Sequence, residues 1–258
     1  MLRVVPAIVT IGLVGAFACG GSGGSSQSAA PAATAGTAKV DPATAGSIAG
    51  KVAIEGDVPP NAAIPMHSDP VCAAANKDGA KAETFVVDNG GLENVFVYIK
   101  DDLGAKYAFD TPKTPVTIEQ KGCHYVPHVA GIRVGQPLEI SNDDSTMHTV
   151  HGMGHSNQEF NFSQPLAGIK NTVSLTTPEV LLPVKCDVHP WMHAFLGVVN
   201  HPFFAVSKDG GTFDLKDVPP GTYTVEAVHE KLGSQTQSVT IGPKENKEIT
   251  FTFKAPAS

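Results

Sequence analysis

The chain has 258 residues, and its 25 Asp and Glu outnumber its 18 Lys and Arg, giving a formal net charge of -7 at pH 7. This acidic balance, with one Trp and four Tyr, argues against nucleic acid as a partner. Beyond residue 18 the sequence holds no run of about 18 or more apolar residues, the length that a membrane-spanning helix needs. The composition therefore favours one large globular domain or two small ones.

Residues 1–18 have the layout of a signal peptide, because one basic residue, Arg3, precedes an apolar stretch that is short for a membrane span. Cys19 follows directly and precedes a Gly- and Ser-rich run, an arrangement that resembles a bacterial lipoprotein cleavage site. Ala16 departs from that pattern, which usually has Leu three residues before the Cys. We expect lipidation at Cys19 and an exported protein, either periplasmic or anchored at the outer membrane. An ordinary signal peptide or a disulfide at Cys19 is the alternative.

Residues 19–45 are rich in Gly, Ser, Ala, Thr and Pro and have almost no large apolar side chain. Such a segment cannot offset its ordering entropy by burial. The sequence predicts a disordered tether that joins the lipid anchor to the folded part.

The rest of the chain is dominated by short runs rich in β-branched and aromatic residues, separated by Gly, Pro, Asn and Asp turns. The only helical signal is a short piece near residues 69–76. Many short strands at this spacing predict an all-β protein of antiparallel sandwiches or barrels. The predicted strands are 47–54, 94–100, 116–119, 129–134, 137–141, 172–175, 180–185, 196–200, 212–215, 222–230, 237–241 and 248–253.

Two cysteines in the folded part, Cys72 and Cys123, have no other assigned role. Unclaimed cysteines in an exported chain most often pair, so we expect a disulfide between them. Two separate buried thiols are the alternative.

The last of the four cysteines begins a run with three kinds of metal ligand, Cys186-Asp187-Val188-His189-Pro190-Trp191-Met192. A thiolate, imidazoles and a weak thioether are the donors of mononuclear electron-transfer copper sites. The second imidazole is predicted to come from His148, with His151 as its nearby rival. A zinc site or a copper-storage site is the competing interpretation.

Residues 125–144, His148 to His151 and the ligand run together resemble the cupredoxin (blue copper) family, most closely its amicyanin, pseudoazurin and plastocyanin-like members. The resemblance implies a Greek-key sandwich or barrel that holds one copper ion. It also implies that His148, Cys186 and His189 are equatorial ligands and that Met192 is the axial one.

Three further residues are expected to support the copper ligands without binding the metal: Thr149, Asn142 and Pro190. Pro190 should stiffen the ligand loop, because its ring fixes the backbone directly after His189. Thr149 stands where amicyanin-like proteins typically have Asn, whose side chain ties the two ligand loops together. Its shorter side chain predicts altered support and an altered reduction potential.

Residues 204–225 look like the latter half of a carboxypeptidase regulatory-like domain, a small Ig- or transthyretin-like β-sandwich, and residues 46–52 have the form of its first strand. We therefore expect first strands of this sandwich in residues 46–110, a cupredoxin domain in residues 111–201 and the remainder of the sandwich in residues 202–254. In this order the cupredoxin is nested within the second sandwich, and a tandem order is the alternative.

The resemblance implies a non-enzymatic carrier that moves single electrons in the cell envelope, cycling between Cu(I) and Cu(II). Its expected partners are a redox protein, such as a cytochrome or a dehydrogenase, and the membrane that holds the lipid anchor. Electrons would pass through the edge of His189. The alternatives are a copper-buffering protein and an envelope interaction module with a structural copper site.

Overall fold

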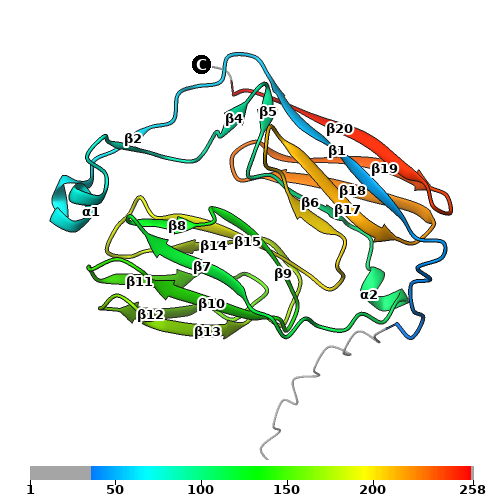
Figure 1. Cartoon of the computed structure of the whole chain (residues 1–258), viewed down its shortest axis with the longest axis horizontal. Coiled ribbons are helices and arrows are strands. Elements are labelled where there is room, and N and C mark those ends of the chain that lie inside the picture. Colours follow the sequence, from blue (N-terminus) through cyan, green and yellow to red (C-terminus); the bar gives the residue numbers. More distant parts are fainter. Residues whose placement is uncertain (1–35, 257–258) are drawn as a thin grey trace, which may run out of the picture. The chain divides into compact units, whose positions relative to one another are not determined.

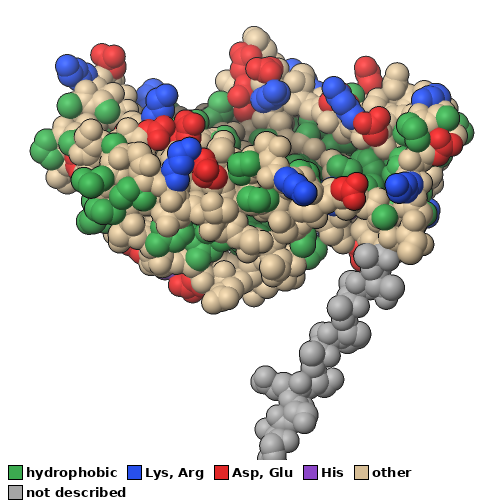
Figure 2. All heavy atoms as spheres, turned by 60° about the horizontal axis from the view of Figure 1, so that its bottom comes forward, with side chains coloured by type: hydrophobic (Ala, Val, Ile, Leu, Met, Phe, Trp, Pro, Cys, Tyr) green, Lys and Arg blue, Asp and Glu red, His purple; other side chains and the backbone are tan. Residues whose placement is uncertain are grey.

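The computed structural model describes residues 36–256. The predicted signal peptide, the lipidation at Cys19 and the first part of the tether lie outside these residues. Within them, no helix is long and apolar enough to cross a membrane. On the face in Figure 2, acidic and basic side chains are interspersed.

The described residues form an all-β fold, which confirms the predicted fold class (Figure 1). Helical structure is limited to the 3-10 turn η1 (Met66–Ser68) and two short helices, α1 (Pro70–Ala75) and α2 (Leu103–Lys106). The strands are β1 (Gly46–Glu55), β2 (Ala63–Ile64), β3 (Ala80–Lys81), β4 (Val87–Asp88), β5 (Gly91–Leu92), β6 (Phe96–Ile99), β7 (Val116–Lys121), β8 (His124–Val126), β9 (Val129–Arg133), β10 (Pro137–Asn142), β11 (His148–Gly152), β12 (Phe160–Gln164), β13 (Lys170–Ser174), β14 (Glu179–Lys185), β15 (His193–Val199), β16 (Phe204–Val206), β17 (Thr212–Val218), β18 (Gly221–His229), β19 (Gly233–Ile241) and β20 (Asn246–Lys254).

The strands from β7 to β15 form what we call the central sandwich. One sheet has the order β13-β10-β7-β8 and the other has the order β12-β11-β14-β15-β9. Alternate residues of these strands point into a shared core, as Leu138 and Ile140 of β10 do. Two parallel pairs, β10 with β7 and β15 with β9, join strands far apart in sequence.

Strands from both ends of the described chain form what we call the terminal sandwich. Its sheets have the orders β17-β1-β5-β4 and β16-β6-β18-β19, and β20 pairs with β1. Strand β1 thus lies between β17, which is antiparallel to it, and β20, which is parallel. The core is apolar and includes Phe213, Phe251 and Phe253. The domain boundaries, and the nested order itself, stay a prediction.

A smaller apolar cluster joins strands of both sandwiches, among them β6, β9 and β15. Here the backbone of Gly197 in β15 approaches the ring of Phe96 closely. A Cβ atom on Gly197 would lie 2.3 Å from that ring. Glycine is therefore needed at this point for the strand to pack against the aromatic side chain.

Residues 36–45, which the sequence places in the disordered tether, are packed against the terminal sandwich. The amide of Gly36 donates to the carbonyl of Gly104, and the carbonyl of Ala38 accepts from Ala108, each over 2.8 Å. Val40 packs against the apolar core. One apolar side chain and paired backbone groups thus hold residues 36–45 against this sandwich.

Residues 66–76, which we call the covering segment, hold η1 and α1. Asp69 caps α1, because its Oδ1 accepts from the amides of Val71 and Cys72 over 2.8 and 3.1 Å. Cys72 is joined by a disulfide to Cys123, in the turn between β7 and β8. The predicted boundaries assign this segment to the terminal sandwich. Its buried Met66 and Cys72 instead pack in the core of the central one.

Candidate metal centre

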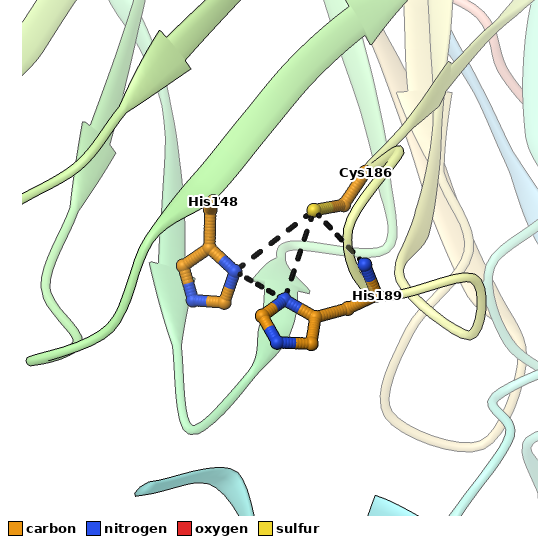
Figure 3. Close-up of side chains that lie close together, drawn as sticks. All are labelled: His148, Cys186 and His189. Atoms are coloured by element: carbon orange, nitrogen blue, oxygen red, sulfur yellow. Dashed lines mark hydrogen bonds between the residues drawn. The ribbon is translucent and has the colours of Figure 1, made fainter. Parts of the chain in front are cut away.

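Three side chains from two separate parts of the sequence converge inside the central sandwich (Figure 3). His148 begins β11, Cys186 directly follows β14, and His189 lies in the turn that leads to β15. Their relative exposures are 0%, 1% and 2%. The two Nδ1 atoms are 2.9 Å apart, and the Cys186 Sγ lies 4.0 Å from the Nδ1 of His148 and 3.8 Å from that of His189.

The turn that carries Cys186 and His189 is closed by its own backbone. The amide of Met192 donates to the carbonyl of His189 over 2.9 Å, and the amide of Cys186 donates to the carbonyl of Met192 over 3.2 Å. Met192 is buried and belongs to the same core cluster as Cys186. Pro190 is exposed within this turn. The fold thus brings His148, Cys186 and His189 together and buries Met192 in the core that contains Cys186.

The Cys186 sulfur accepts hydrogen bonds from the amides of Thr149 and His189, over 3.3 and 3.4 Å. The Thr149 hydroxyl lies 3.7 Å away from it. Burial raises the pKa of the thiol, but the contacts with His148, with these amides and with the hydroxyl outweigh burial and lower the pKa to about 6. The site therefore holds a thiolate, the form that binds metals, at neutral pH.

Thr149, which the sequence analysis expects to support the ligands without binding the metal, connects the two ligand-bearing loops. Its hydroxyl oxygen accepts from the amide of Asp187 over 2.7 Å, next to Cys186. Asn142 shapes the loop before His148, because its side-chain amide donates to the carbonyls of Thr146 and Gln164 over 2.9 Å each. These contacts fix the positions from which the ligands project.

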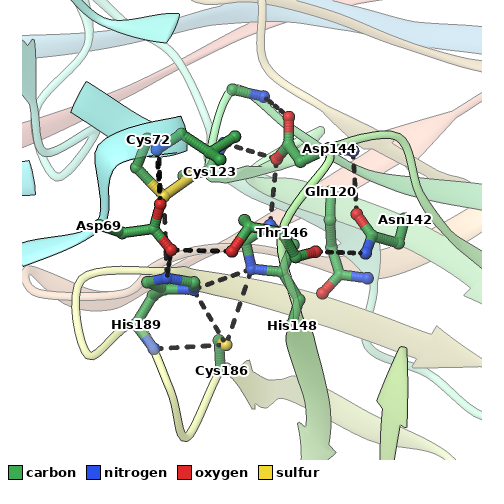
Figure 4. A network of polar contacts seen from close by, with 12 residues as sticks. Asp69, Cys72, Gln120, Cys123, Asn142, Asp144, Thr146, His148, Cys186 and His189 are labelled. Atoms are coloured by element: carbon green, nitrogen blue, oxygen red, sulfur yellow. Dashed lines mark hydrogen bonds and ion pairs between the residues drawn. A yellow bond between two sulfur atoms is a disulfide. The ribbon is translucent and has the colours of Figure 1, made fainter. Parts of the chain in front are cut away.

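Each imidazole is held by a carboxylate on the ring nitrogen that faces away from the cluster (Figure 4). Nε2 of His189 lies 3.2 Å from Oδ2 of Asp69, and Nε2 of His148 lies 3.1 Å from Oδ2 of Asp144. An imidazole that carries its single proton on Nε2 can present its Nδ1 lone pair to a metal. Sequence reasoning missed both carboxylates as site residues.

The pKa values of the two carboxylates and of His148 are shifted in the directions that strengthen the hydrogen bonds between carboxylate and imidazole. For Asp69, burial raises the pKa, but hydrogen bonds from Thr146, from the Cys72 amide and from His189 outweigh it and lower the pKa to about 2. For His148, burial lowers the pKa, but Asp144 and Cys186 outweigh it and raise the pKa to about 9. For Asp144, burial raises the pKa, but hydrogen bonds from His148 and from the amides of Cys123 and Gly122 outweigh it and lower the pKa. Both carboxylates are therefore ionised acceptors at neutral pH.

The cluster has the spacing and chemistry of a small metal site. Two nitrogens bound at about 2.0 Å to one tetrahedral ion would lie roughly 3.3 Å apart, close to the 2.9 Å between the two Nδ1 atoms. Because the pKa of His148 is about 9, copper binding at neutral pH must displace its second ring proton. The resulting two neutral imidazoles and thiolate suit copper in both of its oxidation states. The residues present therefore fit a copper ion after a small opening of the cluster.

His151, the rival to His148, lies outside this cluster. Its Nδ1 is 3.0 Å from Asp187 and its Nε2 is 2.7 Å from Glu159, so both ring nitrogens already have partners. His128 is likewise engaged, 2.8 Å from Glu230 and 3.2 Å from the carbonyl of His193.

The covering segment lies against the edge of His189 that the sequence predicts as the route for electrons. The disulfide sulfur of Cys72 is 3.7 Å from the Nε2 of His189, on the same side as Asp69. Trp191 also contacts this ring, with its centroid 5.0 Å from that of His189 and its Nε1 donating to the carbonyl of Cys123. These contacts leave His189 2% exposed, and the route of electrons through its edge stays a prediction.

No protein-family model matches the sequence, and no curated protein matches it. The solved structures that resemble part of the chain include a copper-containing nitrite reductase (NirK) from Thermus scotoductus SA-01, with 24% sequence identity over 37% of this chain and a TM-score of 0.29. This chain covers 24% of that reductase.

Two smaller proteins also resemble about a third of the chain. A mutant of amicyanin in its Cu(I) form has 16% identity, a TM-score of 0.29 and coverage of 40% of this chain and 97% of its own. The purple cupredoxin from Nitrosopumilus maritimus has 22% identity, a TM-score of 0.27 and coverage of 32% and 97%.

Proposed function

We propose that this protein is a cupredoxin-like carrier that binds one copper ion through His148, Cys186, His189 and Met192 and transfers single electrons. The observation that carries the proposal is the buried cluster of a thiolate and two Nδ1 atoms whose opposite ring nitrogens are held by carboxylates. Copper bound there would supply one-electron chemistry between its Cu(I) and Cu(II) states.

The protein's own contribution to electron transfer is a site that changes little between the two oxidation states. Hydrogen bonds from the amides of Thr149 and His189 fix the sulfur, and Asp144 and Asp69 fix the two imidazoles. A prearranged ligand set keeps reorganisation small. Burial of the ligands also leaves a substrate no direct path from solvent, which favours a carrier over an enzyme.

We further propose a place in the cell envelope, with a tether and lipid anchor ahead of the folded part and a cytochrome or dehydrogenase as redox partner. The sequence pattern at Arg3 and Cys19 supports this location. A carboxypeptidase regulatory-like role for the terminal sandwich rests on its sequence pattern and on the pairing of β1 with β17 and β20.

Copper storage is the second candidate, and burial of His189 at 2% exposure favours it. A covered ligand slows metal loss and also hinders contact with a redox partner. The two functions differ in kinetics. A carrier is reduced and reoxidised rapidly by small redox reagents with copper retained, whereas a storage protein yields Cu(I) to a chelator and changes oxidation state slowly.

Titration of the purified protein with Cu(II), followed by visible absorption, tests the proposal. We expect an intense thiolate-to-copper charge-transfer band that saturates at one equivalent and bleaches on reduction. Cys186→Ser and His148→Asn should abolish the band. The matched control is His151→Asn, which replaces a neighbouring histidine outside the cluster and should retain it. An intact band in Cys186→Ser would refute the ligand assignment.

A further inference from the structure

The two carboxylates that hold the imidazoles are also linked to the two disulfide cysteines. Asp69 accepts from the amide of Cys72 through Oδ1 and contacts His189 through Oδ2. Asp144 accepts from the amide of Cys123 over 2.8 Å through the same Oδ2 that contacts His148. Each half of the disulfide is therefore one hydrogen bond from a carboxylate that orients one imidazole (Figure 4).

Further contacts tie the covering segment to the same loops. The hydroxyl of Thr146, two residues before His148, donates to Oδ2 of Asp69 over 2.8 Å. The side-chain amide of Asn76, at the end of α1, donates to the carbonyl of Gly122 over 2.9 Å. With the disulfide, these bonds fix Asp69 relative to the central sandwich, although Asp69 lies 120 residues from His189 in sequence.

The position of Asp69 has a definite electronic consequence for a metal on the other side of the ring. A carboxylate that accepts the Nε2 proton makes the imidazole a stronger donor at Nδ1 and fixes its tautomer and orientation. A nearby negative charge also stabilises the doubly charged Cu(II) more than the singly charged Cu(I). Both effects are strong here because the histidine is buried.

We propose that Asp69 is a positioning residue for the metal centre: held in place by the Cys72–Cys123 disulfide, it fixes His189 for copper, lowers the reduction potential and slows copper release. This inference rests on the proposed function, since it assigns a role at the same copper site.

Asp69→Asn is the direct test, with Asp143→Asn as its matched control. Asn retains the ability to cap α1, but it cannot present an ionised acceptor to both His189 and Thr146. Asp143 is an exposed carboxylate in the loop before His148, and among the described residues its side chain makes no hydrogen bond to either imidazole. Its substitution therefore removes the same charge without touching a ligand. We expect Asp69→Asn to favour Cu(I) over Cu(II) by about tenfold, a rise in potential of about 59 mV. A shift no larger than that of the control would overturn the proposal.

The metal-free protein gives an independent readout of His189 itself. Long-range proton–nitrogen NMR distinguishes which ring nitrogen carries the proton. We expect the Nε2-protonated tautomer in the unmodified protein and a mixture of tautomers in Asp69→Asn, with His148 unchanged. An unchanged His189 signal would contradict the assigned role even where copper binding is unaffected.

The double variant Cys72→Ala/Cys123→Ala tests the part assigned to the disulfide. Without the bond, the covering segment should hold Asp69 less firmly, and copper affinity should fall by about 10- to 100-fold, the usual effect of losing a partner of a ligand. The reduction potential of the double variant should rise, as it should in Asp69→Asn. Unchanged affinity and potential would refute the disulfide's role.

Failure of this inference is distinguishable from failure of the proposed function. If the unmodified protein forms no thiolate–copper band, the electron-transfer proposal fails. If that band is present and Asp69→Asn leaves the potential and the His189 tautomer unchanged, only the inference about Asp69 fails.

Discussion

The central and terminal sandwiches are both built from two packed sheets around an apolar core, but they differ in how their buried polar groups are arranged. The terminal core is formed mainly by aliphatic and aromatic side chains. The central sandwich buries charged and polar groups at one end, including Asp144, His148 and His189. Buried polar groups are costly unless paired, and each of these three is hydrogen-bonded. Strand β18 of the terminal sandwich also buries Glu226 and His229. What distinguishes the central sandwich is that its buried histidines lie together beside the Cys186 sulfur.

The first and largest test of this comparison removes an aromatic side chain from the terminal core. Phe251 is fully buried there, so Phe251→Ala should lower the free energy of unfolding by about 3–5 kcal/mol. Urea denaturation measures the loss, and Val87→Ala, at an exposed position, is the control. The thiolate–copper band of the folded protein should be unchanged. A lost band would show that the two interiors are not energetically separate.

Buried histidines should titrate in opposite directions in the two sandwiches: the pKa of His148 in the central one is raised, whereas that of His201 beside the terminal core is lowered. His201 is buried near Phe203 of the terminal core, where Nε2 donates to the carbonyl of Ile99 and Nδ1 accepts from the amide of Phe203. Burial lowers its pKa from 6.5 to about 4. The unfolded chain binds this proton more readily than the folded one, so stability is full above pH 6.5 and falls as the pH drops towards 4.

The full loss attributable to His201 is about 3 kcal/mol. Denaturant titrations of the metal-free protein between pH 7 and pH 4 measure it, and His201→Gln should show a shallower dependence on pH. Equal pH dependence in the variant would exclude burial of His201 as a source of acid sensitivity.

The smallest expected effect concerns the hydroxyl that links the two ligand loops. Thr149→Val keeps the shape of the side chain but removes the acceptor for the Asp187 amide. We expect a loss of about 1 kcal/mol in stability and a shifted charge-transfer band, because the hydroxyl also lies near the Cys186 sulfur. Thr149→Ser retains the hydroxyl and should preserve the band position. Identical charge-transfer bands in Thr149→Val and Thr149→Ser would exclude a role for this hydroxyl at the metal centre.

Much of the fold could be predicted from local patterns. Alternating apolar residues mark the longer strands, such as β10 and β20, and turn residues separate them. Strand β12 was missed, since its residues Phe-Asn-Phe-Ser-Gln mix two half-buried rings with polar side chains. The packed end of the tether was missed because its order depends on one valine and on backbone pairing.

The ligand residues could be proposed from sequence because three of them share one short loop. Asp144 carried a weak signal, four residues before His148, but its role depends on the orientation of the side chain. Asp69 carried none. It reaches His189 only through the disulfide and the packing of the covering segment, which are tertiary features that local sequence does not encode.

The central claim is that one copper ion is bound by the Nδ1 atoms of His148 and His189 and the sulfur of Cys186. A crystal structure of the copper-loaded protein, with anomalous diffraction recorded at the copper absorption edge, tests this most directly. We expect one anomalous peak within bonding distance of all three atoms, with Asp69 and Asp144 still on the opposite ring nitrogens. A peak elsewhere, or no copper within bonding distance of the Cys186 sulfur, would contradict the claim.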